Sequence, residues 1–150
     1  MRKAPWYITI PVLLLSLVFH KGYGQKYRFH ESYVKTVNFI DSVDFTTQNG
    51  YLLIEADPEK TGKKYTFIFD SSSPTILAHD VAKVVELNHE GNYPAYISQL
   101  GLSTSALGTL GYMKIGEIEF ESISTYIVQS EIFKTKGFEE VSGIIGANLM

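Results

Sequence analysis

One carboxylate in this chain stands where proton transfer is commonly carried out, at the end of an apolar strand and in front of small hydroxyl residues. Asp70 follows the alternating segment Tyr65–Phe69, and the run Ser71–Ser73 comes directly after it, before Pro74. A strand that delivers a carboxylate into a sharp turn lined with hydroxyl groups holds that carboxylate in a fixed place, as acid–base chemistry requires. Asp70 is therefore the candidate catalytic acid.

A second segment, far downstream, has the pattern of a strand packed closely against another part of the chain. Ile144 and Ile145 are followed by Gly146, and a helix is expected to begin in the residues after it, Ala147–Leu149. Glycine at the end of an apolar strand marks a place where another backbone approaches closely. We expect this element to lie beneath the turn that carries Asp70.

Together the two segments resemble the catalytic strand-turn and the hydrophobic-hydrophobic-glycine element of retropepsin-like aspartic proteases, and the exported bacterial versions most closely. The resemblance covers residues 51–150 and implies an all-β acid-protease barrel lobe that hydrolyses peptide bonds. It assigns roles to several positions: Asp70 as the catalytic aspartate, Ser71 and Ser73 in the active loop, Ile144, Ile145 and Gly146 as its support, and Gly101, Leu102 and Ser103 in a flap that closes over a peptide or protein substrate.

The chemistry of this family needs a second carboxylate. Water is activated between two aspartates that share one proton, because like charges about 3 Å apart cannot both ionise. Only Asp70 is followed by small hydroxyl residues at a strand end, whereas Asp57 lies in a proline-containing turn and Asp80 opens a predicted helix. The resemblance therefore implies a homodimer, or pairing with a second similar lobe.

Two features depart from the family pattern. Ser72 occupies the position of the usual glycine, where a side chain could crowd the water and where a backbone suited to glycine would cost about 1–3 kcal/mol. The sequence also ends at Met150, where family members continue through a helix, so we expect a C-terminally truncated lobe. A peptide-binding lobe without catalysis and a truncated fragment thus remain alternatives to an active endopeptidase.

The N-terminus predicts export. Arg2 and Lys3 precede the apolar stretch Ile8–Phe19, and Gly22 and Gly24 suit a signal peptidase. A membrane anchor is the alternative, but this stretch is shorter than the ~20 residues that span a bilayer. We expect a signal peptide over 1–24, a lead-in over 25–50, no stable membrane insertion, and a periplasmic or extracellular location.

Composition narrows the remaining function classes. The chain has 150 residues, no Cys and a formal charge of −3, so it suits one small domain without disulfides or thiolate metal sites. No run of Lys and Arg suggests a nucleic-acid partner. His30, His79 and His89 lack metal-ligand spacing, and the glycines near residue 110 do not form a dinucleotide motif. We therefore expect neither a metal nor a cofactor.

The mature region is expected to be rich in strands, with one short helix. Residues 57–62 form a turn between the first two predicted strands, which makes that pair a β-hairpin. Apolar residues at helical spacing predict a helix over 79–87, and a mobile loop is expected over 134–140. The expected strands are 51–56, 64–69, 75–77, 95–100, 107–115, 118–120, 124–128 and 143–146, with 101–105 between two of them, and 25–34 is expected to be irregular or an edge strand.

Overall fold

The computed structural model describes residues 32–37, 40–97 and 101–150, so the predicted signal peptide lies outside the described residues. These residues form strands joined by short helical segments: β1 (Tyr33–Val34), β2 (Phe45–Gln48), β3 (Tyr51–Asp57), β4 (Tyr65–Phe69), β5 (Ile76–Ala78), α2 (His79–Ala82), β6 (Leu87–Ile97), β7 (Gly101–Ile115), β8 (Ile118–Val128), α3 (Glu131–Thr135), β9 (Val141–Ile145) and the 3-10 helix η2 (Ala147–Leu149). Among the described residues no helix is long and apolar enough to cross a membrane.

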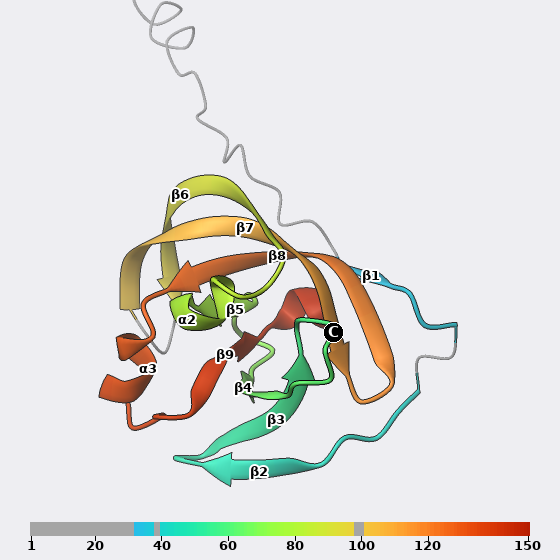
Figure 1. Cartoon of the computed structure of the whole chain (residues 1–150). Coiled ribbons are helices and arrows are strands. Elements are labelled where there is room, and N and C mark those ends of the chain that lie inside the picture. The colour runs from blue at the N-terminus through green and yellow to red at the C-terminus, as the bar shows by residue number, and fades with distance from the viewer. Residues whose placement is uncertain (1–31, 38–39, 98–100) are drawn as a thin grey trace, which may run out of the picture.

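Six of the strands close into a barrel. Their order is β8-β5-β9-β4-β3-β7, and β7 pairs with β8 to complete the ring. Three further strands add outside the ring, β1 on β8, β2 on β3 and β6 on β7 (Figure 1). The expectation of an all-β barrel is therefore confirmed.

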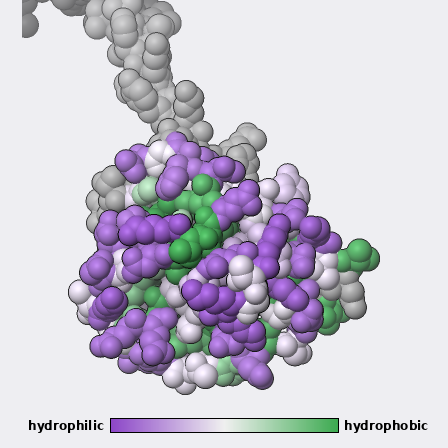
Figure 2. All heavy atoms as spheres, in the orientation of Figure 1, coloured by the Kyte–Doolittle hydropathy of each residue, from purple (hydrophilic) through white to green (hydrophobic). Residues whose placement is uncertain are grey.

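Alternate residues of the strands feed two separate apolar cores. All six ring strands contribute to the first, which includes Ile54, Phe67 and Ile145 and fills the barrel interior. Their neighbours in the sequence point the other way, and Leu53, Ile68 and Ile144 belong to a second core that Phe133 and Phe138 cover. Burying a large apolar side chain contributes about 1.5–3 kcal/mol, so both layers hold the ring in shape. On one face of the molecule, an apolar strip lies in a hollow among hydrophilic side chains, over the region of α2 and β8 (Figure 2).

Several predicted strands are found where the sequence places them. The β3–β4 hairpin pairs Leu52 with Phe69 and Ala56 with Tyr65. Its turn is organised by Asp57, whose carboxylate accepts hydrogen bonds from the N–H groups of Glu59 and Gly62. Strands β5 and β9 also match their predictions within a residue or two, and β1 is a short edge strand.

The helix expected over 79–87 is wrong in its length. Helix α2 ends at Ala82, and Leu87 already begins β6, where it pairs with Leu110. The amide of Gly111 donates a hydrogen bond to the Glu86 carbonyl, which holds the chain extended just before β6. Pairing with β7 therefore overrides the helical spacing of the valines in this segment.

The expectation of a single helix is also corrected, and the loop expected over 134–140 begins only after Thr135. Helix α3 covers Glu131–Thr135, and Phe133 is buried against β9 in the outer core. Phe138 anchors the residues that follow, with its N–H donating to the Phe133 carbonyl. Burial of the Phe133 and Phe138 rings in the outer core stabilises this short helix and the residues after it.

Residues 101–105 are strand rather than a connection between strands. They belong to β7, which pairs with β6 in a long hairpin that arches over the barrel (Figure 1). The lead-in over 25–50 also contains structure that the sequence reading missed. Strand β2 is joined to β3 by a tight turn at Asn49 and Gly50, with φ of 51° and 82°. Asn-Gly is the dipeptide that such a turn prefers.

Candidate active site

The turn that carries Asp70 lies across the end of β9. Strands β4 and β9 run parallel, with Phe69 opposite Ile145, so both strands deliver their next residue to the same end of the barrel. The Asp70 N–H lies 3.0 Å from the Ile145 carbonyl oxygen and donates to it. The Ser73 N–H donates to the Asp70 carbonyl at 3.2 Å and closes the turn. The two segments singled out in the sequence are thus brought together.

Gly146 is the point of closest contact between these segments. A Cβ atom placed on Gly146 would collide with the backbone of Ser73, Pro74 and Thr75. Its φ of −104° is open to other residues, so close packing rather than a special conformation demands glycine here. The amide of Ala147 donates to the Ser73 carbonyl at 2.8 Å. Ile145 and Gly146 thus lie directly against the Asp70 turn, and Ile144 packs in the outer core. Support of an active loop by these three residues stays a prediction.

Thr75 fixes the far end of the turn. Its side chain is fully buried, at 0% exposure, and its Oγ1 accepts a hydrogen bond from the Gly146 N–H at 3.2 Å. Its carbonyl oxygen accepts from the Thr125 hydroxyl at 3.2 Å and from the Tyr126 N–H at 3.0 Å. These hydrogen bonds of Thr75 join the loop to both β9 and β8. Burial raises the pKa of the Tyr126 phenol, which therefore stays neutral.

Asn148 completes this support. Its Oδ1 accepts the Thr75 N–H at 2.8 Å, and its Nδ2 donates to the Ser124 carbonyl at the same distance. The sequence reading gave no polar role to Thr75, Thr125 or Asn148. An amide side chain two residues after an apolar-apolar-glycine strand was the available signal for Asn148, but its partners lie far away in the sequence.

Asp70 is partly buried, and its carboxylate accepts two hydrogen bonds from Ser72. Ser72 directs both its N–H, at 2.9 Å, and its hydroxyl, at 2.7 Å, at Asp70 Oδ1. Within the described residues, the non-glycine residues with positive φ are Asn49, Lys60 and Ser122. The family resemblance expects glycine at position 72. Ser72 is not among the residues with positive φ, so it does not carry the backbone strain that a side chain at this position could impose.

The other serines of the loop differ in exposure. Ser71 and Ser72 are exposed, whereas Ser73 is buried at 3% exposure. The Ser73 hydroxyl has no hydrogen-bond partner among the described atoms. The resemblance expects Ser73 near a bound substrate, and the structure places its side chain beneath the surface of the lone chain.

An apolar pair flanks Asp70. Leu52 and Phe69 face each other across β3 and β4, and both remain open to solvent, at 41% and 38% exposure. Exposed large apolar side chains beside a candidate catalytic group suit contact with a partner chain or with substrate.

The predicted flap residues lie at the end of the β6–β7 hairpin where the chain passes from β6 to β7. Gly101, Leu102 and Ser103 stand opposite residues 97, 96 and 95 of β6. A hairpin extended beyond the ring is a suitable cover for a groove. Closure of this hairpin over Asp70 stays a prediction.

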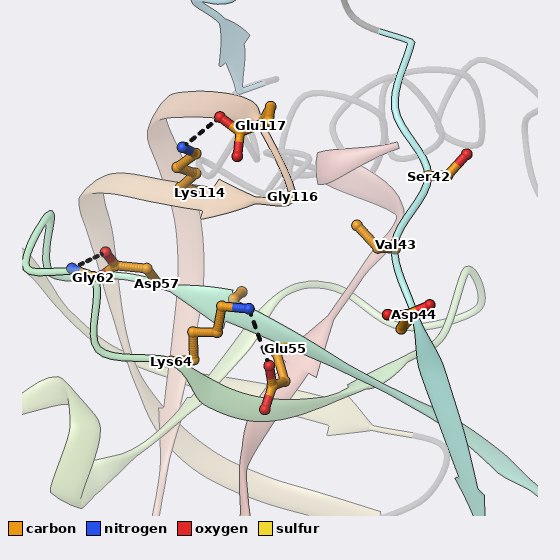
Figure 3. A pocket seen from close by; sticks show the side chains of 11 residues that line it. Ser42, Val43, Asp44, Glu55, Asp57, Gly62, Lys64, Lys114, Gly116 and Glu117 are labelled. Carbon is orange, nitrogen blue, oxygen red and sulfur yellow. Dashed lines mark hydrogen bonds and ion pairs between the residues drawn. The ribbon is translucent and has the colours of Figure 1, made fainter.

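A pocket of about 330 Å³ lies away from the Asp70 loop, where β3 ends and β4 begins (Figure 3). None of the predicted site residues lines it. Four of its charged side chains pair within the chain, Lys64 with Glu55 at 3.2 Å and Lys114 with Glu117 at 2.9 Å. Because these ion pairs and the Asp57 turn engage most of its charged groups, we assign no substrate to it.

The part of the chain that the structure describes contains no group of three or more His, Asp or Glu side chains placed to hold a metal ion. Comparison with protein-family models, with curated proteins and with solved structures finds no match.

Proposed function

We propose that this chain is one lobe of a retropepsin-like aspartic endopeptidase, exported from the cell, that cuts peptide bonds as a pair of lobes. The supporting observation is the crossing of the Asp70 turn over Gly146, with Asp70 hydrogen-bonded to Ile145 and Ala147 hydrogen-bonded to Ser73. This packing holds a carboxylate at the end of a closed barrel, at a place where a second copy can approach.

The proposed chemistry uses two copies of Asp70. One carboxylate accepts a proton from water as the water attacks the scissile carbonyl, while the other, protonated, donates its proton to the carbonyl oxygen. Collapse of the tetrahedral intermediate then breaks the C–N bond, and the leaving nitrogen takes up a proton. Two carboxylates in contact share one proton, which is the state this cycle requires.

The surface around Asp70 supports pairing with a second copy. Ser71 and Ser72 are exposed at the tip of the turn, and Leu52 and Phe69 present apolar surface beside it. A two-fold axis through the turn would bring the two Asp70 residues together and cover both apolar pairs. Ser71 then lies where its hydroxyl can bond across the interface.

A peptide-binding lobe without catalysis is the second candidate, and Ser72 favours it. Its hydroxyl lies 2.7 Å from Asp70 Oδ1 and occupies a lone pair that catalysis would use for water or for the shared proton. A reacting group displaced by about 1 Å can lose ~100-fold in rate. Such a lobe would bind peptides without hydrolysing them.

The decisive test is cleavage of a mixed peptide library between pH 3 and pH 7, with and without pepstatin, by the wild type and by Asp70→Asn. Cleavage that pepstatin and Asp70→Asn both abolish supports the endopeptidase. Mixing the wild type with excess Asp70→Asn chains is then expected to reduce activity, because mixed pairs carry one carboxylate. Peptide binding without cleavage favours the second candidate, and cleavage that survives Asp70→Asn contradicts both.

A further inference from the structure

A small pocket with two histidines lies outside the candidate active site. It has a volume of about 230 Å³ and lies among the start of α2, the β6–β7 hairpin, the end of β8 and α3. Its lining residues come from all five of these elements: His79, His89, Asn92, Ala106, Ile127, Val128, Gln129 and Ile132. None of them takes part in the contacts that hold the Asp70 turn.

The lining is divided into an apolar floor and a polar rim. Ile127 is buried, at 6% exposure, and Ala106, its partner on β7, lies on the same face of the sheet, whereas His89, Asn92 and Gln129 are exposed. Small-ligand sites share this design, in which apolar walls hold the body of the ligand and a few polar groups fix one end. Every polar group at this rim can donate a hydrogen bond, either from an imidazole N–H or from an amide.

Among the residues that the structure describes, no carboxylate or ammonium group lines the pocket. The charged residues nearest to the two histidines in the sequence are Asp80 and Lys83 near α2, Glu86 before β6 and Glu90 on β6, and Glu131 lies at the start of α3. None of these five belongs to the lining. An incoming anion therefore meets donors without a competing negative charge inside the cavity.

We propose that this pocket binds a carboxylate attached to a short branched aliphatic group. The carboxylate lies between His79 and His89, with the amides of Asn92 and Gln129 as further donors, and the aliphatic group lies on Ile127 and Ala106. The pocket is smaller than the roughly 300–1,000 Å³ of a drug-sized site, which limits the ligand to a few carbon atoms beyond the carboxylate.

Two sources supply this chemistry, a free short-chain carboxylic acid and the C-terminal residue of a peptide. The probes are isovalerate for the first source and a tripeptide ending in valine for the second, with the same tripeptide amidated as its control. The proposal stands independently of the proposed peptidase function, because no residue of the pocket takes part in that reaction.

Binding is measured by isothermal titration on protein expressed from the full reading frame. The His79→Gln, His89→Gln double variant is expected to bind isovalerate about tenfold more weakly or worse, because hydrogen bonds to a charged group are worth ~1.5–3 kcal/mol.

Three further variants test the placement. Ala106→Leu fills the cavity from β7 and is expected to abolish binding with both histidines present. Gln129→Glu puts a negative charge at an exposed rim position, where folding is unaffected, and is expected to weaken binding several-fold. Lys83→Gln is the matched control, since it removes one positive charge near α2 without touching the pocket.

The outcomes separate the proposal from its rivals. Saturable isovalerate binding that falls in the double variant and in Gln129→Glu, but not in Lys83→Gln, supports it. Binding of the tripeptide acid but not its amide extends it to peptide C-termini. No saturable binding of either probe up to about 10 mM overturns the proposal. Zn²⁺ binding that Gln129→Glu strengthens, with isovalerate unaffected, overturns it in favour of a cation site.

Discussion

The hydroxyl of Ser72 donates a hydrogen bond to Asp70 Oδ1 at 2.7 Å, and the Ser72 N–H donates to the same oxygen at 2.9 Å. Both donors therefore hold one oxygen of the candidate catalytic carboxylate. The N–H bond would survive with glycine at this position, whereas the hydroxyl bond depends on the serine. The hydroxymethyl group at position 72 thus distinguishes the two proposed functions.

We predict that Ser72→Gly raises peptide cleavage only under conditions in which the chain is dimeric. Removing the hydroxyl releases one hydrogen bond on Asp70 but supplies no second carboxylate. The rate gain is expected to be about tenfold or more, since small displacements at a reacting centre carry large rate effects. Cleavage rates at several protein concentrations provide the measurement, with Ser42→Gly, at an exposed serine away from the Asp70 loop, as the control. A monomeric Ser72→Gly chain that cleaves peptides in an Asp70-dependent way would sink this prediction.

Gly146→Ala is predicted to disrupt the candidate site. The added methyl collides with the backbone of Ser73, Pro74 and Thr75, which cannot move without displacing Asp70. Overpacking of this kind costs about 1–3 kcal/mol, and more where only backbone can yield. Urea denaturation measures the loss. The matched control is Gly111→Ala, where the nearest atom to the new methyl is Glu86 Oε2 at 3.5 Å. Equal stability for the two variants would contradict the proposed packing.

Thr75→Val is predicted to destabilise the protein through a lost acceptor. In the wild type the Gly146 N–H donates to Thr75 Oγ1 at 3.2 Å. Valine keeps the shape of the buried side chain but has no oxygen to accept this hydrogen bond. A buried donor without a partner costs about 1–3 kcal/mol. Thr75→Ser, which keeps the hydroxyl and loses a methyl group, is the comparison in thermal unfolding. If Thr75→Val is as stable as the wild type, this hydrogen bond does not hold the turn.

We predict that the Asp41 carboxylate stabilises the fold and that this contribution is lost in acid. Hydrogen bonds from the Glu117 N–H and then from the Ser42 N–H lower the pKa of the Asp41 carboxyl below its ordinary value. A carboxyl whose pKa is lower in the folded state stabilises the fold above the unfolded pKa and loses that contribution as pH falls through the folded pKa. Its contribution is thus present above about pH 4 and lost below it.

The test of this prediction compares urea midpoints of the wild type and Asp41→Asn from pH 6 to pH 2. Asparagine can still accept the Glu117 N–H but does not titrate, so the difference between the two proteins is expected to shrink as the pH falls. A difference that stays constant over this range would show that Asp41 does not titrate with folding.

Short-range patterns in the sequence were sufficient for much of the site. The β3–β4 hairpin, the strand before Asp70 and the apolar-apolar-glycine strand all follow from alternation and turn residues. The close packing at Gly146 was also predictable, because a glycine at the end of such a strand indicates that another backbone approaches it. These features depend on neighbours in the chain, so a single sequence is enough to predict them.

Features that depend on distant partners were missed or misjudged. The helix over 79–87 was too long because Leu87 pairs with Leu110, and the valines before it give no sign of that partner. Asn148 lies 73 positions from Thr75, whose N–H it accepts, so its role becomes visible only in three dimensions. The Asn49-Gly50 turn is a different case, because its signal was local and was overlooked.

The central claim is that two Asp70 turns meet in a pair of copies. Light scattering of the purified chain over a range of concentrations tests this most directly. The account predicts a particle of twice the chain mass that an arginine introduced at the exposed position 71, as Ser71→Arg, returns to a single chain. A folded wild-type chain that keeps the mass of one copy at every concentration would contradict the pairing of two copies of this chain.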